Sequence, residues 1–372
     1  MTKHSAVLGL AVLMLVLYMG VQITFLDFYN HYGLPFGRVD VDNYMTATSR
    51  GVGFPDHMMI TSLSIIASKF MDMSLFLTFF IPLALTILLP LSVFVLALFM
   101  SKDWTVAFYS TMAYVFGTIS LQAFGISAMW SQMLATIFII WAYIFYETYI
   151  EKKDRGLLTT VYVMVVLTAI AHIKSTAALA IYGALRHILM GRRQLATILI
   201  ATAIAAYAFL TNTMFDSYPY TVNISDVLTS FMHPLLWILA IFFILRNMGT
   251  KDMRLMALML FCTFTFVISY FSVLWRPLLS VLPFLVVFAV MEFFTYLKQA
   301  RPSVGITLGI IFMIALIVFG SNLTKSSIYT MYEEMVPGKF NETRPMDPTY
   351  FKNMFSIRDG NVGSFTNDTN DL

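Results

Sequence analysis

Two aspartates near the N-terminus are the residues whose spacing best suits chemistry. Asp40 and Asp42 stand two positions apart in the polar segment Gly37–Tyr44. On an extended chain, residues i and i+2 point the same way, so both carboxylates can face one site. There they could hold a divalent cation such as Mg²⁺ or Mn²⁺, or one could accept the proton of an attacking hydroxyl. The alternative is a pair of solvated aspartates that caps the next helix.

Four basic side chains are candidates for binding a phosphate. His57 follows a Phe-Pro-Asp segment, while His172 and Lys174 end one long apolar stretch. Arg276 stands between a tryptophan and a proline, where its guanidinium could grip phosphate oxygens as a fork. Each has a plainer alternative, because a histidine can simply be solvated and a lysine or arginine at a span end can contact lipid headgroups.

The composition excludes an ordinary soluble protein. Apolar residues make up 59% of the 372 residues and charged residues only 12%, where a soluble domain has about 25%. The net charge of +3 gives no reason to expect a nucleic-acid partner. The one cysteine, Cys262, excludes a disulfide framework and a cysteine-based metal site. The sequence has no Gly-rich phosphate loop, HExxH motif or nucleophile elbow.

The elements that must position the candidates are apolar stretches of about 19 residues, the usual window for a transmembrane helix. They predict an all-α polytopic membrane protein with about eleven transmembrane helices. The predicted spans are 7–25, 74–100, 105–121, 128–149, 157–171, 175–189, 195–210, 231–245, 255–274, 277–297 and 304–320.

The distribution of basic residues predicts a cytoplasmic N-terminus. With that orientation the short inner loops hold more than half of the 23 basic residues, as the positive-inside rule requires, and the outer side is net negative. All four glycosylation sequons, at Asn223, Asn322, Asn341 and Asn367, then fall outside. The inner basic residues are Lys3, Lys102, Lys152, Lys153, Arg155, Arg186, Arg192, Arg193, Arg246, Lys251, Arg254, Lys298 and Arg301.

This topology divides the chain into a membrane module, 1–321, and a short extracytoplasmic tail, 322–372. The first stretch is expected to be an anchor, because its apolar part is too long for a signal peptide. The first outer loop, 26–73, carries both aspartates. In it Met59, Leu63, Ile66 and Phe70 recur at helical spacing, which predicts a helix in the outer interface that serves as a lid or as the wall of a substrate cleft.

Several short segments resemble the GT-C class of membrane glycosyltransferases. The best local match is Asp40–Tyr44 followed by Gly53–His57, which is similar to the acidic motif and the Tyr/Phe-Pro…His segment of that class. Ala171–Thr176 is similar to a His-containing helix end of archaeal and bacterial members, and Trp275–Pro277 with Leu282–Phe284 to their late Arg…Leu-Pro helix. The chain lacks a large outer domain with a Trp-Trp-Asp signature, so the likeness does not extend to oligosaccharyltransferase catalytic subunits.

The resemblance implies an extracytoplasmic, inverting transfer of sugar in the plasma membrane of an archaeon or bacterium. The donor would be a polyprenyl-phosphate-linked sugar, and the acceptor a glycan, a lipid or a protein. The resemblance implies a base or metal ligand, with Mg²⁺ or Mn²⁺ as the metal, at Asp40 or Asp42. It implies donor-phosphate contacts at His57, His172, Lys174 and Arg276.

Two other functions fit the same sequence. A lipid-linked glycan transporter or flippase would need a polar route through the bundle, and the spans offer only scattered hydroxyls with Gln132 and Asn212. No ionisable residue lies well inside the apolar stretches, which argues against a proton-coupled pump. A non-catalytic assembly subunit would tolerate the loss of both aspartates.

Overall fold

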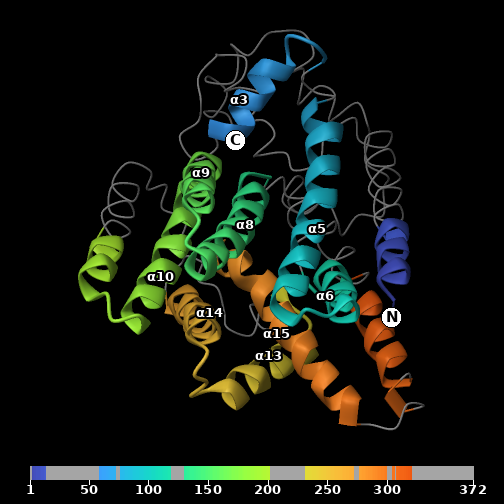
Figure 1. The fold of residues 1–372 in the computed structure, drawn as a ribbon. Helices are drawn as coiled ribbons and strands as arrows, with labels where there is room; N and C mark the ends of the chain where they lie inside the picture. Colours follow the sequence, from blue (N-terminus) through green and yellow to red (C-terminus); the bar gives the residue numbers. More distant parts are fainter. Residues whose placement is uncertain are drawn as a thin grey trace, which may run out of the picture.

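The computed structural model describes residues 2–13, 58–72, 76–118, 130–201, 231–271, 276–299, 304–305 and 307–320. Over these residues the chain is helical apart from turns and one isolated antiparallel bridge, between Thr118 and Met232 (Figure 1). The elements are α3 (Met58–Ala67), the π-helical turn η2 (Phe76–Phe80), α5 (Ile81–Ser101), α6 (Trp104–Gly117), α8 (Trp130–Lys152), α9 (Arg155–Ala171), α10 (Ile173–Leu189), α13 (Pro234–Asn247), α14 (Met253–Phe271) and α15 (Arg276–Gln299).

The predicted all-α class is confirmed for the described residues. The predicted span 157–171 is α9, and the predicted span 277–297 is α15. Three helices in the described part are long and apolar enough to cross a membrane: Ile81–Ser101, Trp130–Lys152 and Leu278–Lys298. The other apolar helices there are shorter, at 10 to 17 residues. The count of eleven crossings therefore stays a prediction.

Lys-Asp pairs set the tight turns between consecutive helices. Lys102 and Lys153 adopt left-handed backbone conformations, with φ of 58° and 57°, which end α5 and α8. Asp103, Asp154 and Asp252 then each accept a backbone N–H of the following helix at 2.8 to 2.9 Å. Such an N-cap satisfies a donor that the helix itself leaves unpaired. These turns consequently follow from local sequence.

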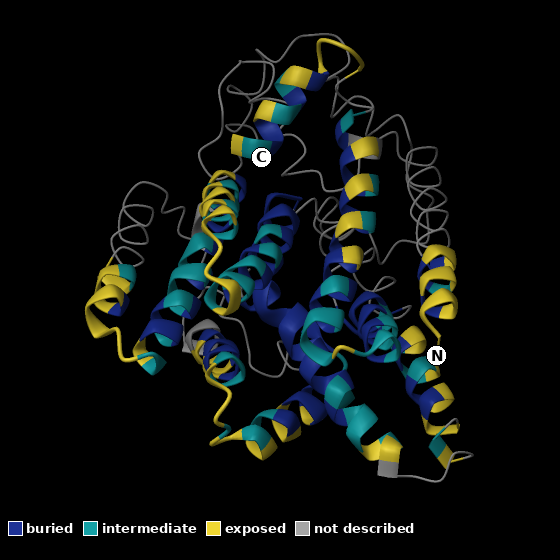
Figure 2. Ribbon diagram, viewed as in Figure 1, coloured by how far each residue is buried: buried dark blue, intermediate teal, exposed yellow. Residues whose placement is uncertain are grey.

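Helix α15 is the centre of the core. The residues from Leu278 to Val290 are buried on every side of the helix, and they form the dark stretch at the centre of Figure 2. Aromatic stacking joins α15 to its neighbours, with ring centroids 4.8 Å apart for Phe243 and Phe288 and 4.3 Å apart for Phe293 and Phe312. A helix that is apolar all round has to be surrounded in this way by other apolar groups.

The outer helices turn large apolar residues away from this core. On α13, four such side chains recur at i, i+3, i+4 and i+7, and each is at least half exposed; they are Ile238, Ile241, Phe242 and Leu245. The helix Thr307–Gly320 has a similar outward face. An apolar stripe of this kind is unfavourable in water and suits contact with lipid.

Ion pairs between helices bring many helix termini to one end of the bundle. Three pairs join segments that are distant in sequence: Glu147 with Arg186 at 2.9 Å, Glu151 with Arg254 at 3.6 Å, and Glu292 with Arg246 at 2.8 Å. The Arg254 guanidinium also lies 5.5 Å from the Phe99 ring centroid, near the end of α5. We call this the charged end; it contains the ends of α5, α8, α10, α13 and α15 and the start of α14.

The opposite end of the bundle carries α3. Helix α3 contacts η2, which precedes α5 and so lies away from the charged end. In Figure 1, α3 and α13 stand at opposite ends of the molecule. We call the end that carries α3 the α3 end.

A helix, α3, is present where the interface helix was predicted, and it ends at Ala67. Its buried side includes the small polar residues Thr61 and Ser64, while Ile66 and Phe70 are 57% and 81% exposed. The apolar residues predicted to form one stripe on this helix therefore lie partly against the bundle and partly on the outside.

Candidate functional site

Three of the predicted site residues lie outside the described residues. These are Asp40, Asp42 and His57, so the acidic pair and its Mg²⁺ or Mn²⁺ stay predictions. Within the part of the chain that the structure describes, no group of three or more His, Cys, Asp or Glu side chains could hold a metal ion.

His172 occupies the junction between α9 and α10. Its extended backbone, with φ of −160° and ψ of 99°, ends one helix and caps the next. Its N–H donates to Thr168 O at 2.8 Å, and its carbonyl accepts from the Ser175 N–H at 2.9 Å. The ring is buried, and Nδ1 lies 2.7 Å from Ser175 Oγ. The imidazole is therefore held firmly at the start of α10.

Two other candidates occupy the first turns of helices. Lys174 is the second residue of α10, and Arg276 is the first residue of α15. The start of α10 lies toward the α3 end, since α9, which leads into it, contacts α3, whereas α15 begins nearer the middle of the molecule (Figure 1). The first turn of a helix has unpaired N–H groups and a partial positive charge, which favours an anion such as phosphate. The fold thus keeps His172 and Lys174 together at the α9–α10 junction, and the start of α15 with Arg276 lies apart from α3.

A buried polar cluster at the charged end escaped the sequence analysis. Arg186 donates from Nε to Glu147 Oε1 at 2.9 Å and from Nη2 to Oε2 at 3.1 Å, and the Tyr182 hydroxyl donates to Oε1. Glu147 is 1% exposed and Arg186 7%. A two-pronged guanidinium–carboxylate pair of this kind neutralises both charges away from water.

Aromatic rings enclose this cluster. The Tyr182 ring lies 5.3 Å from that of Tyr143 and 5.8 Å from that of Phe261. Beside them, Tyr146 Oη is 3.0 Å from His187 Nε2. The cluster fixes the last turns of α8 and α10 against each other.

The sequence analysis assigned Arg186 to an inner loop, and that placement is wrong. Arg186 is buried within α10, and its partner Glu147 is buried within α8. The helical spacing of Tyr143, Tyr146 and Glu147, and that of Tyr182 and Arg186, was the available signal, because such residues share a helix face. The partner helix, however, is not evident from spacing.

The described residues thus define an all-helical protein with three helices that could cross a membrane and two chemically distinct ends. Comparisons with protein-family models, curated proteins and solved structures found no match to this chain. Its function is consequently inferred from its own residues and their arrangement.

Proposed function

We propose that the protein is a GT-C-type glycosyltransferase that crosses the membrane about eleven times. It moves a sugar from a polyprenyl-phosphate-linked donor to a glycan, lipid or protein acceptor. The observation that carries this proposal is the separation of the two ends. The α9–α10 junction that holds His172 and Lys174 lies toward the α3 end, while the ion pairs and Lys-Asp turns occupy the other end.

The orientation of the proposed enzyme follows from this separation. Lysines and arginines in short turns favour the cytoplasmic side of a membrane, so the charged end is cytoplasmic. The α3 end then faces outward from the plasma membrane of an archaeon or bacterium, the N-terminus is cytoplasmic, and the tail 322–372 is extracytoplasmic. The basic residues that set this orientation are not those proposed to bind the donor.

The proposed reaction needs a base and a cationic phosphate site. A carboxylate takes the proton of the acceptor hydroxyl, the hydroxyl oxygen bonds to the sugar's anomeric carbon, and the bond from that carbon to the phosphate oxygen breaks. Negative charge builds on the departing lipid phosphate, where cationic groups stabilise it. The proposed base or metal ligand is Asp40 or Asp42, with Mg²⁺ or Mn²⁺ as the metal, and the proposed phosphate contacts are His57, His172, Lys174 and Arg276.

The deciding experiment is a mass profile of surface and lipid-linked glycans in the native host. The intact gene is compared with an Asp40→Asn, Asp42→Asn variant matched for membrane expression, and with an Asp347→Asn, Asp371→Asn variant that loses the same charge from the tail. We expect two changes in the first variant alone. Its glycans should be short by one defined sugar, and the lipid donor that still carries this sugar should accumulate.

An unchanged profile in the correctly inserted first variant would contradict sugar transfer at the acidic pair. The protein would then be better explained as a lipid-linked glycan transporter or a non-catalytic assembly subunit. These two functions are distinguished by whether lipid-linked glycans accumulate when the whole gene is deleted.

A further inference from the structure

The acidic side chains of the charged end are all engaged. Glu147, Glu151 and Glu292 pair with arginines of neighbouring helices. The aspartates of the three Lys-Asp turns cap the helices that follow them. A hydrogen bond from a backbone N–H does not cancel the charge of a carboxylate, so the acids of this end, within the described residues, offset only part of the positive charge of its lysines and arginines.

Eight basic residues at the same end are exposed and make no ion pair with the described acids. They are Lys102, Lys152, Lys153, Arg155, Arg192, Arg193, Lys251 and Lys298. They leave an excess of positive charge on the surface of this end.

Five of these cations belong to two turns of the charged end. Lys152, Lys153 and Arg155 surround the turn from α8 to α9, and Arg192 and Arg193 follow the end of α10. Both turns lie at the same end because the ion pair and the tyrosine–histidine contact described above join α8 to α10 near their C-terminal ends. We call these five residues the basic patch.

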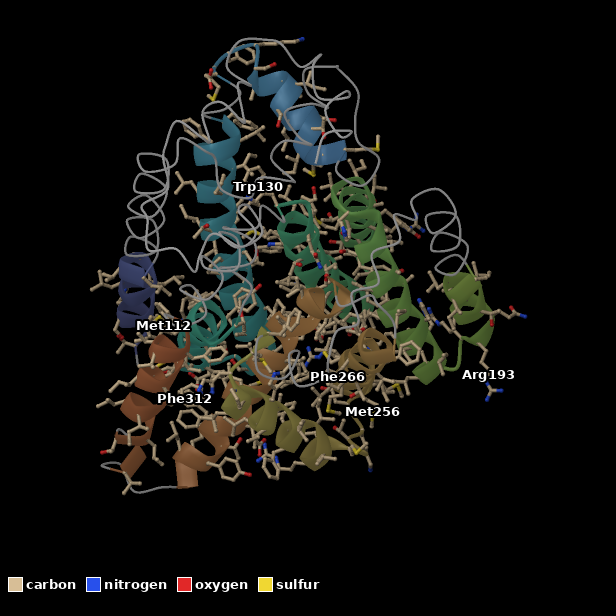
Figure 3. The ribbon with its side chains drawn as sticks, turned by 180° about the vertical axis from the view of Figure 1, so that it is seen from behind. Met112, Trp130, Arg193, Met256, Phe266 and Phe312 are labelled. Carbon is tan, nitrogen blue, oxygen red and sulfur yellow. The ribbon has the colours of Figure 1, made fainter. Side chains whose placement is uncertain are left out.

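The turn after α10 has a defined shape. Gly191 adopts a φ of 75°, and the Arg192 N–H donates to His187 O at 2.8 Å, which closes the helix end. Arg193 projects away from the bundle (Figure 3). On either side of the turn, Ile188 and Leu195 are 45% and 40% exposed. Cations therefore lie directly beside outward-facing apolar side chains.

We propose that the basic patch binds the phosphate headgroup of an anionic phospholipid, with the lipid's acyl chains against Ile188 and Leu195. The charge is complementary, and guanidinium groups match phosphate oxygens in two-pronged geometry. The apolar neighbours distinguish this ligand from a soluble phosphate, which would gain nothing from them. The inference rests on the chain being embedded in a membrane and is independent of sugar transfer.

The test is the binding of fluorescent phosphatidylglycerol to the purified full-length chain in mild detergent. Arg192→Gln, Arg193→Gln is compared with Lys251→Gln, Lys298→Gln, which removes the same charge from the same end. We expect the arginine variant to weaken binding roughly tenfold or more and the lysine variant by about twofold or less, because headgroup attraction falls off within a short distance.

Three results would overturn the proposal. Equal weakening by both variants would mean diffuse electrostatic attraction, and equal competition by unlabelled phosphatidylcholine would mean that the headgroup charge is not recognised. Competition by glycerol 1-phosphate at the same concentration as the lipid would mean a soluble phosphate site. An Arg192→Lys, Arg193→Lys variant that retains at least part of the binding checks that the helix end is still folded.

Discussion

At the residue scale, removing one partner from the buried pair of Glu147 and Arg186 should be strongly destabilising. Glu147→Gln leaves the Arg186 guanidinium in a site with 7% exposure and no counter-charge. We expect a loss of about 3–5 kcal/mol of unfolding free energy, because an unpaired buried charge is costly. Thermal unfolding in detergent would measure it.

Two further variants separate the charge effect from packing. Glu147→Gln combined with Arg186→Met should be more stable than Glu147→Gln alone, since no lone charge remains. Tyr182→Phe removes only one hydrogen bond to the carboxylate and should cost about 1–3 kcal/mol. A double variant less stable than the single one would show that Arg186 contributes chiefly through packing.

Lys174 and Arg276 provide the residue-scale test of the proposed donor site. If they stabilise charge on the departing phosphate, Lys174→Gln or Arg276→Gln should slow turnover of the lipid-linked donor at least about tenfold. Lys298→Gln, at the charged end, removes the same charge and should leave the rate unchanged. Equal rates in all three variants would remove these residues from the mechanism.

At the element scale, glycines set how closely helices approach. A Cβ placed on Gly320 would lie 2.6 Å from the backbone oxygen of Phe116, whereas one on Gly309 would come no nearer than 3.6 Å to any other residue. Gly320→Ala should therefore force Thr307–Gly320 away from α6 and cost about 1–3 kcal/mol. Gly309→Ala, on the same helix, should be neutral or slightly stabilising, because alanine favours helix.

The same thermal unfolding measurement distinguishes these two glycine variants. Equal stability of both would mean that the helix Thr307–Gly320 is free to shift without loss. A loss confined to Gly320→Ala would establish the close approach of its backbone to α6.

At the scale of the whole molecule, the two ends should lie on opposite sides of the membrane. Cys262 is buried and can be replaced to give a cysteine-free background. A single cysteine at Lys69, at the α3 end, should then react with a membrane-impermeant maleimide in intact cells. A cysteine at Lys153 should react only after permeabilisation, and reaction of both in intact cells would contradict the proposed topology.

Much of the helical architecture could be predicted from apolar run length. The stretch 277–297 corresponds to α15 within a few residues at each end, because a long apolar run must bury its backbone polar groups in a helix when water is excluded. Orientation within the bundle could not be predicted. Thr61 and Ser64 of α3 are buried while Ile66 is exposed. For a helix in a membrane, lipid removes the usual penalty for exposing apolar groups, so hydrophobicity alone does not specify the inward face.

The sequence by itself determined the helices, their Lys-Asp turns and the excess of basic residues in short loops, because run length, helix capping and charge are local properties. Only the tertiary structure decided which of those charges are neutralised. Glu147 and Arg186 stand 39 positions apart and meet because α9 carries the chain back between them. That pairing depends on how α8, α9 and α10 pack. The local sequence of each helix does not specify which other helix it contacts.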